Sequence, residues 1–124
     1  MGKIKVVGLG PGDIEQLPFG VYQLLKKEQP LYLRTKLHPV VKDLEQEGLV
    51  FQSFDAIYEG NDQFEDVYKT IVKELLTAAQ KEDIIYAVPG HPMVAEKSVQ
   101  LLLENEFGIS IEIKGGKSFL DDLF

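Results

Sequence analysis

The stretch KIKVVGLGPGD, residues 3–13, decides the fold class of this chain. Its β-branched run Ile4–Val7 is typical of a short strand buried on both faces, and the glycines after it end that strand. Strand-like and helix-like stretches then alternate along the chain. Further strands are expected at Leu31–Leu33, Leu49–Phe51, Ile84–Val88 and Ile109–Ile113. Helices are expected at Phe19–Lys27, Pro39–Gln46, Phe64–Lys81 and Val94–Glu106, with a polar loop at Ser53–Asp62.

This alternation predicts an α/β protein with three layers, in which helices cover both faces of a mainly parallel five-stranded sheet. The chain has 124 residues, about the size of one compact domain. It contains no repeat, low-complexity stretch or linker, so residues 1–124 are interpreted as one unit. The helix expected at Phe64–Lys81 is the clearest, because its apolar residues follow the helical period: Phe64, Val67, Tyr68, Ile71, Leu75 and Ala78.

Composition and charge exclude several classes of function. Hydrophobic residues make up 44% and charged residues 27%, as in ordinary globular proteins. With no cysteine, the chain has no thiol nucleophile, disulfide or thiolate metal site. The formal net charge of −7 disfavours nucleic acid and anionic membrane surfaces as partners. We therefore expect a cytoplasmic protein with a small-molecule substrate, and a cationic or zwitterionic ligand meets no electrostatic barrier.

Three unusual loops follow the first, fourth and fifth expected strands. They are the glycine-rich loop Gly8–Asp13, the loop Pro89–Pro92 and the loop Gly115–Ser118. Because ligands of parallel α/β sheets bind beyond the carboxyl ends of the strands, these loops are expected to share one edge and to form a binding site.

The first loop does not match a dinucleotide fingerprint. Its glycines follow G-x-G-x-G rather than G-x-G-x-x-G, Pro11 removes a backbone donor, and Asp13 adds a negative charge where pyrophosphate would lie. A tight turn that uses glycine only for its conformational freedom stays open as an alternative. The third loop resembles the end of a phosphate-binding P-loop, but Ser110 stands where that motif needs glycine.

Polar residues in two places are candidates for chemistry. His91 can act as an acid, a base or a hydrogen-bond partner, and no pattern of metal ligands accompanies it. Arg34, Lys36 and His38 form a basic cluster after the second strand. They are either solvated loop charges or a site for substrate carboxylates, which arginine binds through paired hydrogen bonds.

The motifs GLGPGD, PGHPMVAEKS and GGKSF, in this order, resemble the N-terminal half of the tetrapyrrole methylase family. The histidine of Gly90-His91-Pro92 and the stretch LYLRTKLHPVV resemble the branch fused to a MazG-type nucleotide pyrophosphohydrolase. This resemblance implies a methyltransferase that uses S-adenosyl-L-methionine (SAM). It implies cofactor contacts at Gly10, Pro11, Gly12, Pro89, Gly90, His91, Val94, Ser118 and Phe119. Weaker candidates for substrate binding are Asp13, Arg34, Lys36 and His38, and no catalytic residue is assigned.

Two departures from the uroporphyrinogen methylases bear on the acceptor. Those enzymes carry an acidic residue in a Y-D-R-like motif, where this chain has Tyr32-Leu33-Arg34, and Asp55–Asp62 lacks their basic loop residue. The acceptor is therefore expected to be a porphyrinoid or another small molecule. Two alternatives stay open: an NADP-type oxidoreductase domain with Arg34 at the 2′-phosphate, and a non-catalytic SAM-binding or regulatory module of a nucleotide pyrophosphohydrolase fusion.

The pattern of the last residues, Ser118–Phe124, predicts the start of a helix with an apolar face. We expect the chain to be the N-terminal part of a longer protein. The second half of the methylase domain, and any MazG-type domain, are then expected to lie beyond these 124 residues. On this interpretation the 124 residues alone are inactive, and the full-length protein is a homodimer.

Overall fold

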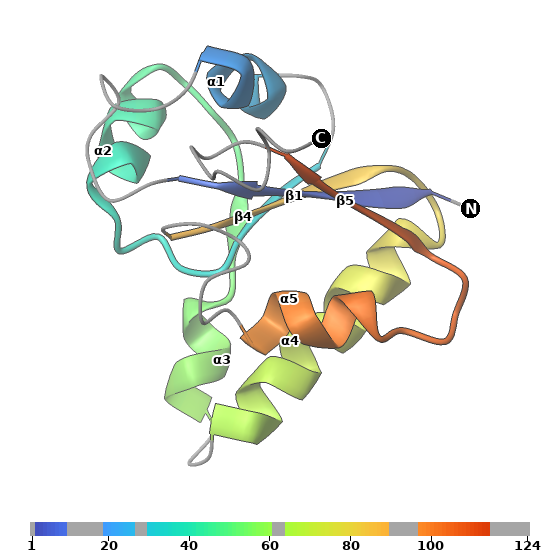
Figure 1. Cartoon of the computed structure of the whole chain (residues 1–124). Coiled ribbons are helices and arrows are strands. Elements are labelled where there is room, and N and C mark those ends of the chain that lie inside the picture. Colours follow the sequence, from blue (N-terminus) through green and yellow to red (C-terminus); the bar gives the residue numbers. More distant parts are fainter. Residues whose placement is uncertain (1, 10–18, 27–29, 61–63, 90–96, 115–124) are drawn as a thin grey trace.

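The computed structural model describes residues 2–9, 19–26, 30–60, 64–89 and 97–114 (Figure 1). Its strands are β1 (Lys3–Gly8), β2 (Leu31–Leu33), β3 (Gln52–Ser53), β4 (Ile84–Val88) and β5 (Ser110–Lys114). Its helices are α1 (Phe19–Leu25), α2 (Pro39–Gln46), α3 (Asp55–Gly60), α4 (Phe64–Ala79) and α5 (Lys97–Leu103). The strands form one parallel sheet in the order β3-β2-β4-β1-β5, which confirms the predicted fold class.

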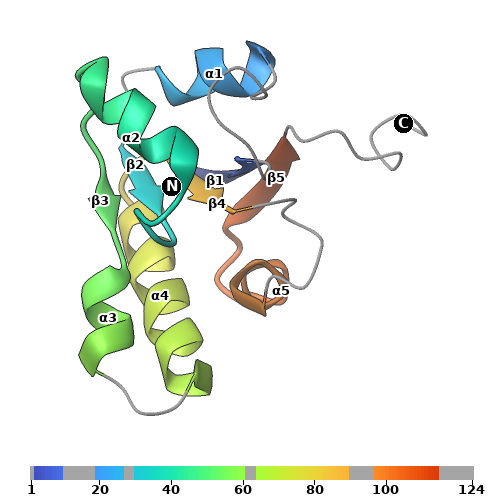
Figure 2. The same cartoon turned by 90° about the vertical axis from the view of Figure 1, so that its left-hand side faces the viewer.

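Helices cover both faces of this sheet, as Figures 1 and 2 show. The central strand β4 explains the layering, because its side chains alternate between two cores. Ile84, Tyr86 and Val88 pack in the core that contains α4 and α5. Ile85 and Ala87 pack in the core that contains α1 and α2. All five residues of β4 are buried, as expected for a strand covered on both faces.

The longest helix, α4, follows its predicted apolar spacing. Val67, Ile71 and Leu75 are buried, while Tyr68 and Ala78 are partly buried. These positions recur every three or four residues, so one face of α4 packs against the sheet and against α5. Among the described residues, no helix has both the length and the apolar character that a membrane crossing requires.

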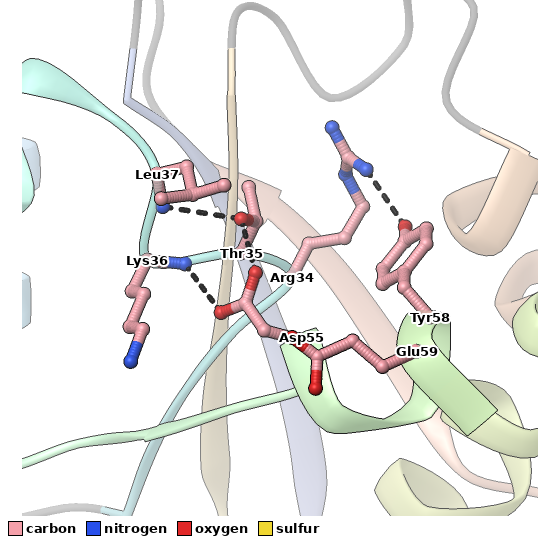
Figure 3. A pocket seen from close by; sticks show the side chains of 7 residues that line it. All are labelled: Arg34, Thr35, Lys36, Leu37, Asp55, Tyr58 and Glu59. Carbon is pink, nitrogen blue, oxygen red and sulfur yellow. Dashed lines mark hydrogen bonds between the residues drawn. The ribbon is translucent and has the colours of Figure 1, made fainter.

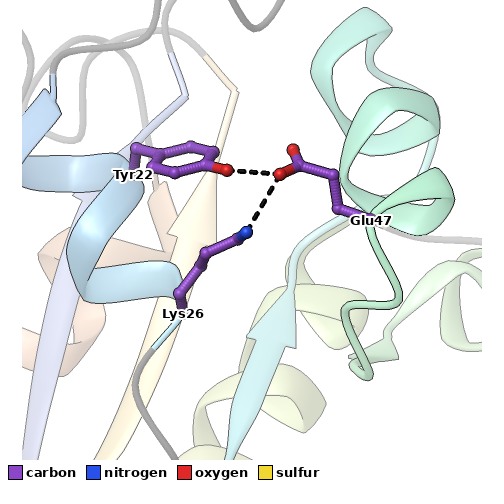
Figure 4. Close-up of polar contacts among 3 residues, drawn as sticks. All are labelled: Tyr22, Lys26 and Glu47. Atoms are coloured by element: carbon purple, nitrogen blue, oxygen red, sulfur yellow. Dashed lines mark hydrogen bonds and ion pairs between the residues drawn. The ribbon is translucent and has the colours of Figure 1, made fainter.

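Polar side chains connect α1 to α2 at the surface of the opposite layer (Figure 4). Glu47, just after α2, accepts a hydrogen bond from the Tyr22 hydroxyl and forms an ion pair with Lys26 at 2.9 Å. The Lys26 ammonium also lies 4.9 Å from the centre of the Tyr22 ring. These contacts are exposed, so they orient the two helices more than they stabilise them.

The prediction of a strand at Leu49–Phe51 is wrong. The third strand is β3, at Gln52–Ser53, and it pairs with Tyr32 and Leu33 of β2. Leu49 and Phe51 pack against the core below α1 and α2, whereas Val50 is 86% exposed. The apolar residues of Leu49–Phe51 therefore serve side-chain packing, and pairing of the backbone with β2 begins only at the next residue, Gln52.

The prediction of a loop over Ser53–Asp62 is also wrong, because α3 occupies Asp55–Gly60. The Ile57 amide donates to the Phe54 carbonyl at 3.0 Å, and Ile57 and Tyr58 pack at the edge of the core. These six residues have their three apolar side chains next to one another and show no helical period, which is why the pattern predicted no helix.

Three helices are shorter than expected, among them α4, which ends at Ala79 rather than Lys81. Helix α1 ends at Leu25 rather than Lys27, and α5 ends at Leu103 rather than Glu106; residues 94–96 lie outside the described part. Asn105 explains the end of α5. Its side-chain amide donates to the carbonyls of Leu102 and Ile109, and its oxygen accepts from the amides of Phe107 and Ile109. These bonds replace the helical pattern with a turn.

A small substitution at Gly2 is expected to have a strong effect on stability. A Cβ atom on Gly2 would lie 2.2 Å from the backbone carbonyl of Glu82 and 2.5 Å from the Asp83 nitrogen. Gly2→Ala is therefore expected to push β1 away from this turn and to lower the free energy of unfolding by about 1–3 kcal/mol. Urea unfolding measures the change. The matched control is Gly20→Ala in α1, where nothing lies within 4 Å, and it should cost nothing. Equal stability of the two variants would contradict the close approach.

Candidate functional site at the carboxyl edge of the sheet

The three loops singled out in the sequence leave the sheet at one edge. Strands β4, β1 and β5 are neighbours, and their last residues are in register: Gly8 lies beside Val88, and Val7 beside Lys114. The expectation of a shared edge is therefore confirmed. The candidate contacts at Gly10, Pro11, Gly12, Asp13, Gly90, His91, Val94, Ser118 and Phe119 lie outside the described residues and stay predictions.

The described residues at the ends of β1 and β4 are neutral. Leu9 follows β1, is buried, and donates its amide to the Val88 carbonyl at 2.9 Å. Pro89 follows β4 and is half-buried. The hydrogen bond holds the two strand ends together at the points where the first and second loops begin.

A cavity of about 510 Å³ lies next to these strand ends, where β2 ends (Figure 3). Its lining comes from the segment after β2 and from α3: Arg34, Thr35, Lys36, Leu37, Asp55, Tyr58 and Glu59. Because β2 pairs with β4, this cavity is at the same edge of the sheet as the three loops.

Tyr58 positions the guanidinium group of Arg34 in this cavity. The Arg34 Nη1 atom donates to the Tyr58 hydroxyl at 2.8 Å, and both residues are partly buried. The Arg34 backbone amide donates to the Ala87 carbonyl of β4 at 3.0 Å. Main chain and side chain of Arg34 are thus held by two different elements, which limits the positions that its guanidinium can take.

Asp55 holds the segment that follows Arg34. Its Oδ1 accepts a hydrogen bond from the Thr35 hydroxyl at 2.6 Å, and its Oδ2 accepts one from the Lys36 amide at 2.9 Å. The Thr35 hydroxyl oxygen in turn accepts from the Leu37 amide at 3.1 Å. Since Asp55 is the first residue of α3, these bonds connect α3 directly to the segment after β2.

The structure brings together two of the three residues of the predicted basic cluster. Arg34 and Lys36 line the cavity. His38 does not: it caps α2, where its Nδ1 accepts a hydrogen bond from the Val40 amide at 3.1 Å. Asp55 and Tyr58 were not predicted as site residues, because their segment has the sequence pattern of a loop. The available signal was an aspartate placed to begin a helix.

Comparison with known proteins gives the chain its family. The family model of Tetrapyrrole (Corrin/Porphyrin) Methylases matches residues 3–123. The chain belongs to this family. It is also 54% identical, over 125 residues, to the uncharacterized protein YabN of Bacillus subtilis (strain 168). That alignment covers 99% of the chain and 26% of YabN, so the chain spans about a quarter of its relative's length.

The family to which the chain belongs is one of methyltransferases. The described residues contain no group of three or more His, Cys, Asp or Glu side chains that could hold a metal ion. At the carboxyl edge, the neutral ends of β1 and β4 lie near a cavity that is lined by Arg34, Lys36, Asp55 and Glu59, among others. Such a cavity can bind a carboxylate or a zwitterion.

The hydrogen bonds of Asp55 predict how the stability of this family member responds to acid. Burial raises the pKa of Asp55, but hydrogen bonds from Thr35, Lys36 and Ser53 together outweigh it, so the pKa lies below its ordinary value of 3.8. The stabilisation is therefore complete above that value and is lost as the pH falls through the lower, folded-state pKa.

We expect the free energy of unfolding to drop between about pH 5 and pH 3, with a smaller drop in Asp55→Asn. Urea unfolding at both pH values measures it. Glu59→Gln is the control, since Glu59 lines the same cavity but is exposed and should leave the pH dependence unchanged. An Asp55→Asn variant with the full acid sensitivity would show that Asp55 does not contribute.

Proposed function

We propose that the chain forms the SAM-binding half of a SAM-dependent methyltransferase that acts on a porphyrinoid or another small-molecule acceptor. The observation that carries this proposal is the register of β4, β1 and β5, which brings three loops with the family's motifs to one edge. The family match over residues 3–123 supports the same conclusion.

The described residues at the loop bases fit SAM by their chemistry. SAM is a zwitterion with an additional sulfonium charge, and the residues where the first and second loops begin, Gly8, Leu9, Val88 and Pro89, carry no charge that would repel it. Neutral strand ends suit such a ligand, because they do not repel the sulfonium. SAM supplies an activated methyl group, so the protein's work is to orient the two reactants and to exclude water.

The cavity after β2 is proposed as the acceptor side of the site. Arg34 would bind an acceptor carboxylate through its guanidinium, and Tyr58 would position that guanidinium through their 2.8 Å hydrogen bond. Lys36 adds a second positive charge at the same cavity. Asp13 stays a candidate from the sequence, whereas the capping role of His38 in α2 argues against its participation.

The strand order disfavours the NADP-type oxidoreductase. In the dinucleotide-binding fold the second strand lies beside the first, so that a residue after the second strand can reach the ribose. Here β4 separates β1 from β2, and Arg34 follows β2. A dinucleotide on the loop after β1 would have to cross the end of β4 before it met Arg34.

We further propose that the chain is part of a cytoplasmic protein of the MazG-fused branch. The motif Gly90-His91-Pro92 supports this, and so does the relative YabN, of which the chain covers only 26%. The net charge of −7 supports a small-molecule acceptor over nucleic acid.

Calorimetric titration of the full-length protein with SAM and with NADPH tests the assignment. We expect SAM to bind and NADPH to give no heat of binding. Tight NADPH binding without SAM binding would overturn the proposal. If SAM binds and no porphyrinoid or other carboxylate-bearing acceptor is methylated, the non-catalytic module becomes the better description.

A further inference from the structure

Two hydroxyl groups meet in the core between the sheet and α5. The Tyr86 hydroxyl of β4 and the Ser98 hydroxyl of α5 are hydrogen-bonded at 2.8 Å, and both side chains are fully buried. Apart from tyrosine, Ser98 is the only residue with a polar side chain that is buried in the described part of the chain. Apolar groups of the same shape would cost little stability in place of such a pair, so stability alone is a weak reason for it.

The position of this pair in the chain connects it to the binding edge. Tyr86 lies two residues before the end of β4, and Ser98 is the second residue of α5. The chain between these elements, residues 89–96, includes Gly90, His91 and Val94, for which the family resemblance implies contacts with SAM. The hydrogen bond therefore joins the two elements at which the second loop begins and ends.

The tyrosine side of the pair is held firmly. The backbone of Tyr86 lies in the middle of the sheet, beside Val6 of β1 and Tyr32 of β2. Its ring meets the buried Phe54 ring edge to face, with 6.1 Å between the ring centres. The Tyr86 hydroxyl is thus a fixed point relative to the carboxyl ends of the strands.

Helix α5 needs such a fixed point. It has seven residues, whereas helices shorter than about 12 residues are barely stable on their own, so its position depends on packing. Val99 and Leu102 are buried in the core below the sheet, but apolar contacts have no preferred direction and allow a helix to shift or rotate. A hydrogen bond is directional, so the bond from Ser98 to Tyr86 sets where α5 begins relative to β4.

We propose that Tyr86 and Ser98 are positioning residues for SAM. Their hydrogen bond holds the start of α5 against β4 and so fixes both ends of the second loop at the binding edge. This inference rests on the proposed function, in which that loop contacts SAM. The pair acts through the placement of the loop ends, because a small displacement of binding groups is enough to lower affinity.

A double-mutant cycle on the full-length protein tests the pair. Tyr86→Phe and Ser98→Ala each remove one hydroxyl and keep the rest of the side chain, so both variants are expected to fold. Calorimetric titration should show an affinity for SAM about tenfold lower in each single variant. Because both variants lose the same bond, the double variant should also bind about tenfold more weakly than the unchanged protein, and not about a hundredfold more weakly.

Ile4→Val is a control of matched stability. Ile4 is fully buried in the same core as Tyr86, but it lies beside Ile84 at the opposite end of β4. The loss of one methylene group from a buried isoleucine and the loss of a buried hydroxyl cost similar, small amounts of stability. Urea unfolding establishes that the losses match, and we expect this control to bind SAM with unchanged affinity.

Three results would contradict the positioning role. Unchanged affinity for SAM in Tyr86→Phe and Ser98→Ala would show that the bond positions nothing. A loss of about a hundredfold in the double variant would show two independent effects. An equal loss in Ile4→Val would show that SAM binding follows overall stability. Failure of the unchanged protein to bind SAM is a different result, which refutes the proposed function and the positioning role with it.

Discussion

Replacing Tyr86 with alanine is expected to lower the free energy of unfolding by about 3–5 kcal/mol. Tyr86 is fully buried at the centre of β4 and is among the largest buried side chains of the chain. Its ring meets the Phe54 ring edge to face, with 6.1 Å between the ring centres. Alanine would leave a cavity between the sheet and the layer of α4 and α5, because the rigid strands around it cannot collapse.

A second substitution at the same position separates packing from hydrogen bonding. The Tyr86 hydroxyl is hydrogen-bonded to the Ser98 hydroxyl of α5 at 2.8 Å, and Ser98 is also fully buried. Tyr86→Phe keeps the ring and removes this bond, so it should cost only about 1 kcal/mol. Urea unfolding of both variants measures the difference, with the exposed Val50→Ala as the control. A loss below about 1 kcal/mol for Tyr86→Ala would mean that this core is loosely packed.

Replacing Gly90 with valine is expected to abolish SAM binding by the full-length protein, which we take as a loss of at least about 100-fold in affinity, or about 2.7 kcal/mol. The resemblance to the tetrapyrrole methylases places a SAM contact at Gly90, directly after Pro89 at the end of β4. Glycine lets a ligand approach the backbone closely, and the branched side chain of valine would occupy that space.

Calorimetric titration with SAM measures the loss, and circular dichroism establishes that the variant is folded. Gly60→Val is the matched control, because a Cβ atom on Gly60 has nothing within 4 Å. We expect this control to bind SAM as the unchanged protein does. Unchanged affinity in a folded Gly90→Val variant would remove the second loop from the site.

Long elements with a repeated pattern could be predicted from the sequence. Helix α4 repeats its apolar positions over four turns, and β4 is apolar throughout. In both elements the pattern of apolar residues in the sequence therefore predicts the element and its buried side chains. Strand β3 has no such pattern in the sequence. It has two residues, its existence depends on pairing with Tyr32 and Leu33, and the apolar run before it packs without pairing.

The candidate site was predictable where it depends on strand ends and unpredictable where it depends on side-chain contacts. Arg34 and Lys36 follow a strand, so the parallel topology alone places them at the binding edge. Asp55 and Tyr58 reach the same cavity from α3, about twenty residues later, through hydrogen bonds that no local pattern encodes. Likewise, only the structure shows that the Nδ1 of His38 accepts a hydrogen bond from the Val40 amide of α2.

The position of β4 between β1 and β2 affects how the protein emerges from the ribosome. The only described strands that pair with β1 are β4 and β5, and β4 begins at residue 84. During synthesis β1 therefore has no strand to pair with until about eighty further residues have been made. Throughout that interval its unpaired edge is exposed to other nascent chains and to chaperones. The sheet can close only when β4 has left the ribosome, so any translation pause before that point prolongs this vulnerable state.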